Sequence, residues 1–186
     1  MKPRTILLLI TLLAFILPPA KAAPASKPVM VYYMPWFTAK PYRDSWGWHW
    51  TMNHFNPDLR NASSERQIAS WYYPLIGPYD SSDPAVLEYH VLLMKLAGVD
   101  GVIVDWYGSA DFLDYRANNE ATLKLLQFTR KAGLKFSICY EDQTVQHLID
   151  GHYLKADEAV SHARQEMLYL QANFFSDVSY LRLKGR

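Results

Sequence analysis

The sequence has little cysteine and no excess of charge of either sign. Its 186 residues contain one cysteine, Cys139, so no disulfide can form within the chain. No cluster of cysteine and histidine has the spacing of a zinc site. The formal net charge is +1, without a block of basic residues, and this argues against a nucleic-acid partner. We therefore expect neither a metal nor a cofactor, and no nucleic acid among the partners.

Long apolar runs are also scarce, and the one near the start of the chain is short for a membrane span. Lys2 and Arg4 flank the start of an apolar run over residues 6–17, and small residues follow at Ala20 and Ala22. This pattern is typical of a secretory signal peptide, whereas a spanning helix needs about 20 apolar residues. We predict a signal peptide over residues 1–22, a short tail over 23–27 and one domain over 28–186. The protein would be secreted or periplasmic, with no membrane partner after cleavage; the alternative is an uncleaved membrane anchor.

Tryptophan, in contrast, is abundant and concentrated. All six tryptophans lie between Trp36 and Trp106, in the segments YYMPWF, DSWGWHW, SWYYPLIGPYDSSD and VDGVIVDWYG. Aromatic residues this dense, mixed with Asp, His, Pro and Gly, are unusual for a plain hydrophobic core. Rings with polar edges suit stacking on the apolar faces of sugars. The first functional hypothesis is therefore a carbohydrate site.

Three short apolar runs predict buried strands, and three periodic segments predict helices. The strands are expected at residues 29–34, 99–105 and 134–140, and the helices at 84–97, 119–132 and 157–174. The segment after the first strand, to about residue 82, is rich in proline and glycine and has no sustained period. It is predicted to be a long structured loop, and a loop of this length is usually functional. Strands that alternate with helices predict a parallel sheet.

Side-chain alternation suggests how these strands are used. An inward-facing Asp105 turns Val102 and Val104 toward the helices, and an inward-facing Glu141 does the same for Phe136 and Ile138. Small residues inside and bulky apolar residues outside suit a closed barrel. The predicted fold class is α/β, a partial (β/α)8 barrel with about three βα units and a long loop after the first strand.

Two carboxylates are the candidate catalytic groups. Asp105 and Glu141 follow successive strands, and the active site of a parallel α/β barrel lies at the carboxyl ends of its strands. Enzymes that cleave sugars typically use two carboxylates, one as the acid and the other as the base or nucleophile. The alternative for Asp105 is that it caps a turn. For Glu141 function is favoured, because Asp142 is better placed to cap the next segment.

Four aromatic residues near the strand ends are candidate substrate-binding residues: Tyr33, Trp36, Trp106 and Tyr107. Each has two interpretations, ring stacking on a sugar or packing over the barrel mouth. Trp46, Trp48 and Trp50 alternate, which predicts a short strand with one buried face. His49 between them is either a sugar ligand or a structural residue.

The order of motifs resembles glycoside hydrolase family 99 and its neighbour family 71. The similarity runs from YYMPWF through YYPLIGPYDSSD and AGVDGVIVDWYG to FSICYEDQT, over about residues 29–185, and its most specific part is the ordered pair IGPYDSSD and GVIVDWYG. The resemblance implies a (β/α)8 barrel and a retaining enzyme that acts on α-linked mannose through a 1,2-anhydro sugar. It also implies that two glutamates from late strands assist the reaction.

The chain shows three βα units, whereas an eight-stranded barrel takes about 250 residues. The late glutamates are therefore expected to be absent, and the resemblance carries over only the residues of the early strands: Tyr33, Trp36, Asp105, Trp106, Tyr107 and, less directly, Glu141. An exposed barrel edge predicts self-association. The leading hypothesis is an incomplete secreted glycoside hydrolase acting on mannan or α-glucan. The alternatives are a non-catalytic carbohydrate-binding protein and an inactive fragment.

Overall fold

A computed structural model of the protein describes residues 27–182. The predicted signal peptide and most of the predicted tail lie outside these residues. Three strands form one parallel sheet in the order β1 (Met30–Tyr33), β2 (Gly101–Trp106) and β3 (Lys135–Tyr140). The predicted α/β class with a parallel sheet is confirmed.

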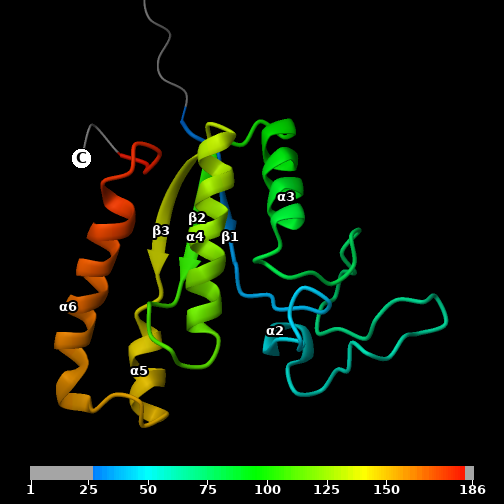
Figure 1. Ribbon diagram of the computed structural model, residues 1–186, viewed down its shortest axis with the longest axis horizontal. Helices are drawn as coiled ribbons and strands as arrows, with labels where there is room; N and C mark the ends of the chain where they lie inside the picture. Colours follow the sequence, from blue (N-terminus) through cyan, green and yellow to red (C-terminus); the bar gives the residue numbers. More distant parts are fainter. Residues whose placement is uncertain (1–26, 183–186) are drawn as a thin grey trace, which may run out of the picture.

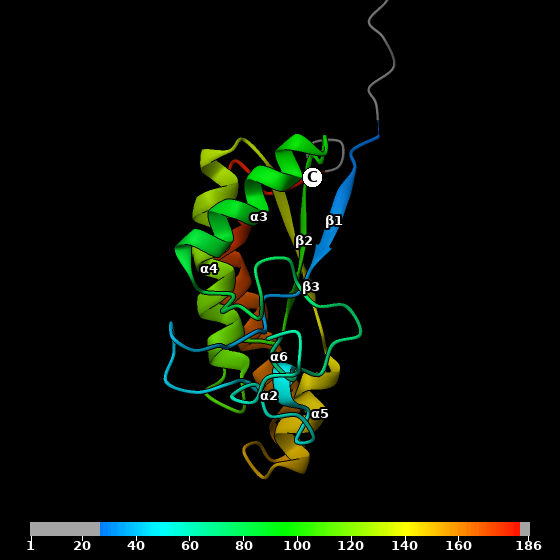
Figure 2. The same ribbon diagram turned by 90° about the vertical axis from the view of Figure 1, so that its right-hand side faces the viewer.

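Three helices cover one face of this sheet, as Figures 1 and 2 show. They are α3 (Pro84–Leu96), α4 (Tyr115–Lys131) and α6 (Ala159–Leu170). Val102, Val104 and Phe136 are fully buried between the sheet and these helices. The alternation along β2 and β3 therefore turns these three side chains toward the helices, as the sequence predicts.

The opposite face of the sheet is not covered by a helix among residues 27–182 (Figure 2). Tyr32 on β1 is 49% exposed there, and the register aligns it with Ile103 and Ser137. Beyond β3, Tyr180 forms a parallel bridge with Phe136, so the chain returns to the sheet in the same direction as the three strands.

Local residue chemistry explains where the elements begin and end. The Asp83 side chain accepts a hydrogen bond from the Ala85 backbone N–H at 2.9 Å and so caps α3, while Pro84 opens its first turn. Gly98 follows this helix with φ +73°, a conformation that favours glycine. At the start of β2 a Cβ on Gly101 would collide with the carbonyl oxygen of Lys135, so the close approach of β2 and β3 requires glycine.

The segment between β1 and α3 forms a lobe, defined here as residues 34–83, that lies beside the carboxyl ends of the strands (Figure 1). It has a small core of its own, in which Ala39, Trp50 and Ile68 are buried. Its one helix is α2 (Trp48–Thr51). The expectation of a short strand over Trp46–Trp50 is wrong: Trp48 and Trp50 belong to a helical turn, in which only Trp50 is buried, and Trp46 lies just before it.

The remaining helical segments depart from the expected bounds. Helix α4 begins at Tyr115, four residues earlier than expected, and α5 (Gln143–Asp150) was not expected at all. The expected helix over 157–174 consists of a 3-10 turn, η1 (Ala156–Glu158), then α6, then a π-helical turn, η2 (Gln171–Phe175). Within residues 27–182 no helix is long and apolar enough to cross a membrane.

Candidate functional site

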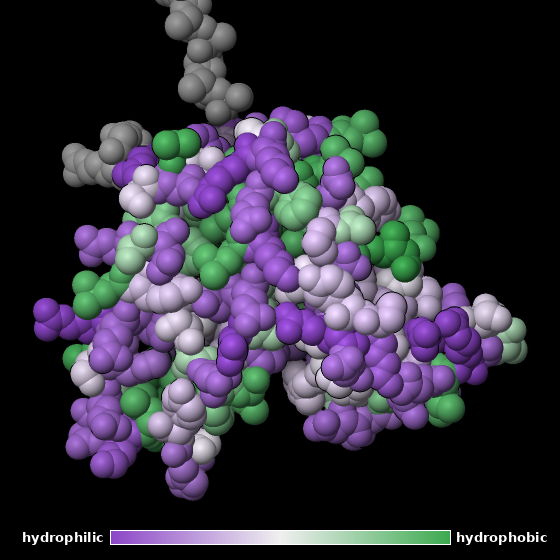
Figure 3. All heavy atoms as spheres, in the orientation of Figure 1, coloured by the Kyte–Doolittle hydropathy of each residue, from purple (hydrophilic) through white to green (hydrophobic). Residues whose placement is uncertain are grey.

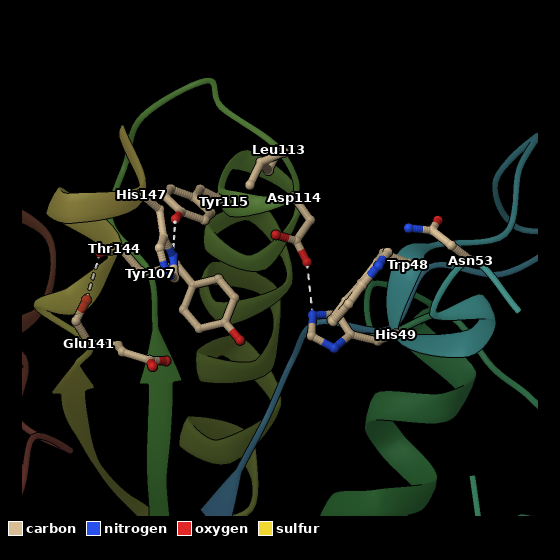
Figure 4. Close-up of a pocket in the computed structure, with 10 residues that line it drawn as sticks. All are labelled: Trp48, His49, Asn53, Tyr107, Leu113, Asp114, Tyr115, Glu141, Thr144 and His147. Atoms are coloured by element: carbon tan, nitrogen blue, oxygen red, sulfur yellow. Dashed lines mark hydrogen bonds and ion pairs between the residues drawn. The ribbon is translucent and has the colours of Figure 1, made fainter. Parts of the chain in front are cut away.

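A groove lies where the carboxyl ends of β2 and β3 meet α2 of the lobe, the start of α4 and the start of α5 (Figures 1 and 4). Two adjoining cavities form it, of about 630 and 660 Å³, and they share Trp48, His49, Tyr107 and Glu141. Trp36, Asp105 and Tyr32 line one of them, and Asp114, Tyr115 and His147 line the other. The space-filling view is indented between α5 and the lobe (Figure 3). The groove thus joins residues from both parts of the chain.

Asp105 lies at the end of β2 on the face away from the helices and is 3% exposed. Asn118 of α4, which is fully buried, donates its side-chain N–H to the Asp105 backbone oxygen at 3.2 Å and so holds this end of the strand. Burial raises the pKa of Asp105, and two groups oppose this shift: the Tyr32 hydroxyl and the positive charge that His49 carries when both of its ring nitrogens are protonated. One carboxyl oxygen, Oδ1, is buried and has no hydrogen-bond partner among residues 27–182.

Glu141 follows β3 directly and is half-buried at the junction of the two cavities. Its backbone is fixed on both sides: its N–H donates to the Trp106 carbonyl at 3.0 Å, and its carbonyl accepts from the Thr144 hydroxyl at 2.6 Å. Burial raises the pKa of Glu141, and the negative charge of Asp105 raises it further, while His147 acts in the opposite sense. The two predicted carboxylates are therefore electrostatic neighbours in one groove.

Trp36 and His49 form the lobe side of the groove. Their rings stack with centroids 4.3 Å apart and an interplanar angle of 5°. His49 Nε2 lies 3.0 Å from Asp114 Oδ2, which links α2 to the residue that precedes α4. Trp36 Nε1 is buried and has no partner among residues 27–182. Figure 4 shows His49 and Glu141 on opposite sides of the groove with Tyr107 between them.

Tyr107 and Tyr115 line the groove between the carboxylates and α5. The two rings meet edge to face at 5.4 Å, and the Tyr115 hydroxyl lies 3.3 Å from His147 Nδ1. Burial raises the pKa of Tyr107 far above its ordinary value, and burial raises the pKa of Tyr115 to about 12. Both hydroxyls therefore stay protonated over the physiological range and remain hydrogen-bond donors.

Two of the six predicted site residues lie outside the groove. Trp106 is fully buried, stacks on Tyr169 of α6 at 5.7 Å and donates its Nε1–H to Asn119 at 2.9 Å. Tyr33 is 9% exposed, and its hydroxyl lies 3.0 Å from Nδ1 of His90 on α3. Both side chains face the helices, so they are core residues here and offer no ring to a ligand. The alternation that turns Val104 toward the helices also predicts these directions.

The structure brings together the other four predicted residues: Trp36, Asp105, Tyr107 and Glu141. It also adds groove residues that the sequence left out: Tyr32, Trp48, Asp114, Tyr115 and His147. Tyr32 could have been found by alternation. Tyr33 faces the helices, so Tyr32, the adjacent residue of β1, must face the opposite side of the sheet. The others lie in α2, at the start of α4 or just before it, and in α5, and no local pattern specifies the positions of these helices. No group of three metal-ligating side chains occurs among residues 27–182.

Comparison with known proteins identifies relatives of this chain. The family model described as Glycosyl hydrolase family 99 matches residues 24–181. The glycoprotein endo-alpha-1,2-mannosidase-like protein of Danio rerio is 33% identical over 94 residues, which are 45% of this chain and 21% of the relative. The human protein of the same description is 33% identical over 92 residues, 43% of this chain and 20% of the relative. The matched stretch is thus about a fifth of the length of these relatives.

A solved structure shares the fold. The family 99 endo-alpha-mannosidase of Bacteroides thetaiotaomicron, determined in complex with bis-tris propane, superposes with a TM-score of 0.56 at 22% sequence identity. The superposition covers 85% of this chain and 39% of that one. The arrangement of β1–β3 and their helices therefore also occurs within a larger enzyme.

Proposed function

The chain belongs to glycosyl hydrolase family 99, and we propose that it forms part of the glycan-binding and catalytic site of a hydrolase that acts on α-linked mannose. The observation that carries this proposal is the pair Asp105 and Glu141 at the ends of adjacent parallel strands, both with raised pKa values, in a groove lined by aromatic rings. The named function of the relatives supports mannose as the sugar.

We infer that β1–β3 are the first three strands of an eight-stranded barrel. Their parallel order, the helices on one face only and the parallel bridge of Tyr180 to Phe136 support this inference. In such a barrel the uncovered face of the sheet is the inner face, and the groove is one side of the mouth. Residues from further strands would complete the site.

Different residues of the groove can bind a sugar and donate a proton to it. A raised pKa keeps a carboxyl protonated to a higher pH than usual, so that it can donate a hydrogen bond or a proton to a glycosidic oxygen. Ionised, the same group accepts hydrogen bonds from sugar hydroxyls. Trp48 is 52% exposed at the rim and offers an accessible ring face for stacking.

Two assays with the full chain test the proposal. Incubation with yeast mannan and with α-1,3-glucan, followed by analysis of released oligosaccharides, tests hydrolysis, and electrophoresis in a gel that contains mannan tests binding. Retardation by mannan, with or without release of oligosaccharides, supports a glycan site, and release distinguishes an enzyme from a non-catalytic binder. Neither retardation nor release with any α-linked glycan would overturn the proposal.

A matched pair of variants locates the site. Trp48→Ala removes an exposed ring that lines the groove, and Trp71→Ala removes a ring that is 93% exposed elsewhere on the lobe. Neither change disturbs a packed core. Mannan should retard the Trp48→Ala variant less than the wild type and the Trp71→Ala variant as much as the wild type. The reverse result would show that mannan binds outside the groove.

A further inference from the structure

Contacts with Trp36, Trp48 and Asp114 hold the His49 ring in place. Its side chain is only 12% exposed, although it belongs to the short helix α2 of the lobe. One face of the imidazole stacks on Trp36, with an interplanar angle of 5°, and Trp48 contacts it edge to face at 5.1 Å. Stacking fixes the plane of the ring, and the contact with Asp114 fixes its rotation within that plane.

The contact with Asp114 also determines which nitrogen carries the proton. An ionised carboxylate only accepts hydrogen bonds, so His49 Nε2, 3.0 Å from Asp114 Oδ2, must be the protonated nitrogen. In the neutral ring Nδ1 then has a free lone pair. The Asp114 side chain is available to His49 because it makes no hydrogen bond to the first turn of α4, which it precedes.

No group among residues 27–182 hydrogen-bonds to Nδ1, and Nδ1 is not among the buried polar atoms that lack a partner. Figure 4 shows the only dashed contact of the ring leaving from the nitrogen that faces Asp114. Because His49 lines both cavities, the open nitrogen is an acceptor available to whatever fills the groove.

We propose that His49 Nδ1 accepts a hydrogen bond from a hydroxyl of the bound glycan, and that Asp114 and Trp36 are positioning residues that fix its tautomer and its plane. The proposal rests on the glycan-binding function proposed above. An acceptor with a fixed tautomer demands a donor from the ligand, and a sugar hydroxyl is such a donor. Discrimination by a hydrogen-bonding site is strong, because a ligand without the hydroxyl leaves the site unpaired.

Two substitutions separate the acceptor from the link to Asp114. In His49→Gln the amide nitrogen can occupy the position of Nε2 and keep the hydrogen bond to Asp114, but nothing replaces Nδ1. In His49→Asn the amide oxygen can take the position of Nδ1, while the link to Asp114 is lost. His54→Gln changes an exposed histidine of the same lobe that does not line the groove and is the matched control.

Titration of the full chain with α-1,2-mannobiose, followed by nitrogen-15 NMR of the histidine rings, tests the proposal. In the free chain His49 should show the Nε2–H tautomer, and the mannobiose should shift its Nδ1 resonance. The dissociation constant should rise roughly three- to tenfold in His49→Gln, the value of one hydrogen bond, and by less in His49→Asn. It should stay unchanged in His54→Gln.

The outcomes distinguish this proposal from the function on which it rests. If the wild type binds the disaccharide and His49→Gln binds it equally well, the assignment of His49 is wrong while the groove remains a glycan site. An Nδ1–H tautomer in the free chain would also overturn the assignment. If the wild type binds neither the disaccharide nor mannan, the proposed function fails and the role of His49 fails with it.

Discussion

Glu166 of α6 accepts two hydrogen bonds from Ser109, a residue 57 positions earlier in the chain. The Ser109 backbone N–H lies 3.0 Å from Oε2, and its hydroxyl lies 3.1 Å from Oε1. Glu166 is 2% exposed, and its carboxyl group packs against Gly108, which has φ +113°. The contact fixes the loop after β2, and Tyr107 in the groove immediately precedes that loop. A buried carboxylate of the outer helix thus positions a residue of the site.

Removal of the Glu166 carboxylate should therefore weaken the fold. In Glu166→Ala both hydrogen bonds from Ser109 to the buried carboxylate are lost, which should cost roughly 1–3 kcal/mol in the free energy of unfolding. Glu166→Gln keeps an acceptor oxygen and should lose less. Urea denaturation measures both changes, with Glu88→Ala on the exposed surface of α3 as the control, expected within about 0.5 kcal/mol of the wild type. Equal stabilities of Glu166→Ala and the control would show that Ser109 does not depend on this carboxylate.

The burial of Trp106 gives a second prediction about stability. Its ring is fully buried and its Nε1–H is satisfied by Asn119, so Trp106→Ala leaves a large cavity and should cost roughly 3–5 kcal/mol. Trp106→Phe should cost less, because a ring remains. Trp71→Ala, at a position that is 93% exposed, should change the free energy of unfolding by at most about 0.5 kcal/mol. A small effect of Trp106→Ala in chemical denaturation would return Trp106 to the list of candidate ligand-binding residues.

Asp105 and Trp106 also show what the sequence can and cannot predict. The apolar runs and the caps of α3 are local signals, so the strands, this helix and the direction of Asp105 follow from them. The same alternation predicts that Trp106 points to the helices, but its aromatic character suggested sugar stacking instead. The contact between His49 and Asp114 could not be predicted. The two residues are 65 positions apart, and the path of the lobe that places α2 beside the start of α4 has no periodic sequence pattern.

The raised pKa of Asp105 predicts how stability depends on pH. Because this pKa is higher in the folded than in the unfolded chain, the folded state binds more protons between the two values. Asp105 therefore contributes most to the free energy of unfolding at pH values below the ordinary carboxyl pKa, near 4. This contribution is lost as the pH rises through the pKa that Asp105 has in the folded chain. Asp105→Asn cannot ionise, so its stability relative to the wild type should improve between pH 3.5 and pH 7. Urea denaturation at several pH values tests this, with Asp44→Asn at an exposed position as the control. If the stability of Asp105→Asn relative to the wild type falls toward neutral pH, Asp105 is not a buried charge.

The same substitution should act on the second carboxylate. The charge of Asp105 raises the pKa of Glu141, so Asp105→Asn should lower the pKa of Glu141 toward its ordinary value. Titration of the side-chain carboxyl carbons by NMR measures this shift directly. Asp44→Asn again serves as the comparison. An unchanged titration of Glu141 in Asp105→Asn would mean that the two carboxylates do not form one electrostatic unit.

The uncovered face of the sheet predicts association between copies of the chain. On this face Tyr32 is 49% exposed and Ile103 lies beside it in register, and β1 has no strand on its outer side within residues 27–182. An apolar face next to an open strand edge favours pairing with a second copy. Sedimentation velocity should show a sedimentation coefficient that increases with concentration. Ile103→Lys places a charge on this face and should suppress the increase, whereas Leu96→Lys, at a position 86% exposed on the helical side, should leave it unchanged. A monomeric wild type at all concentrations, or equal effects of the two lysines, would exclude this face as the contact surface.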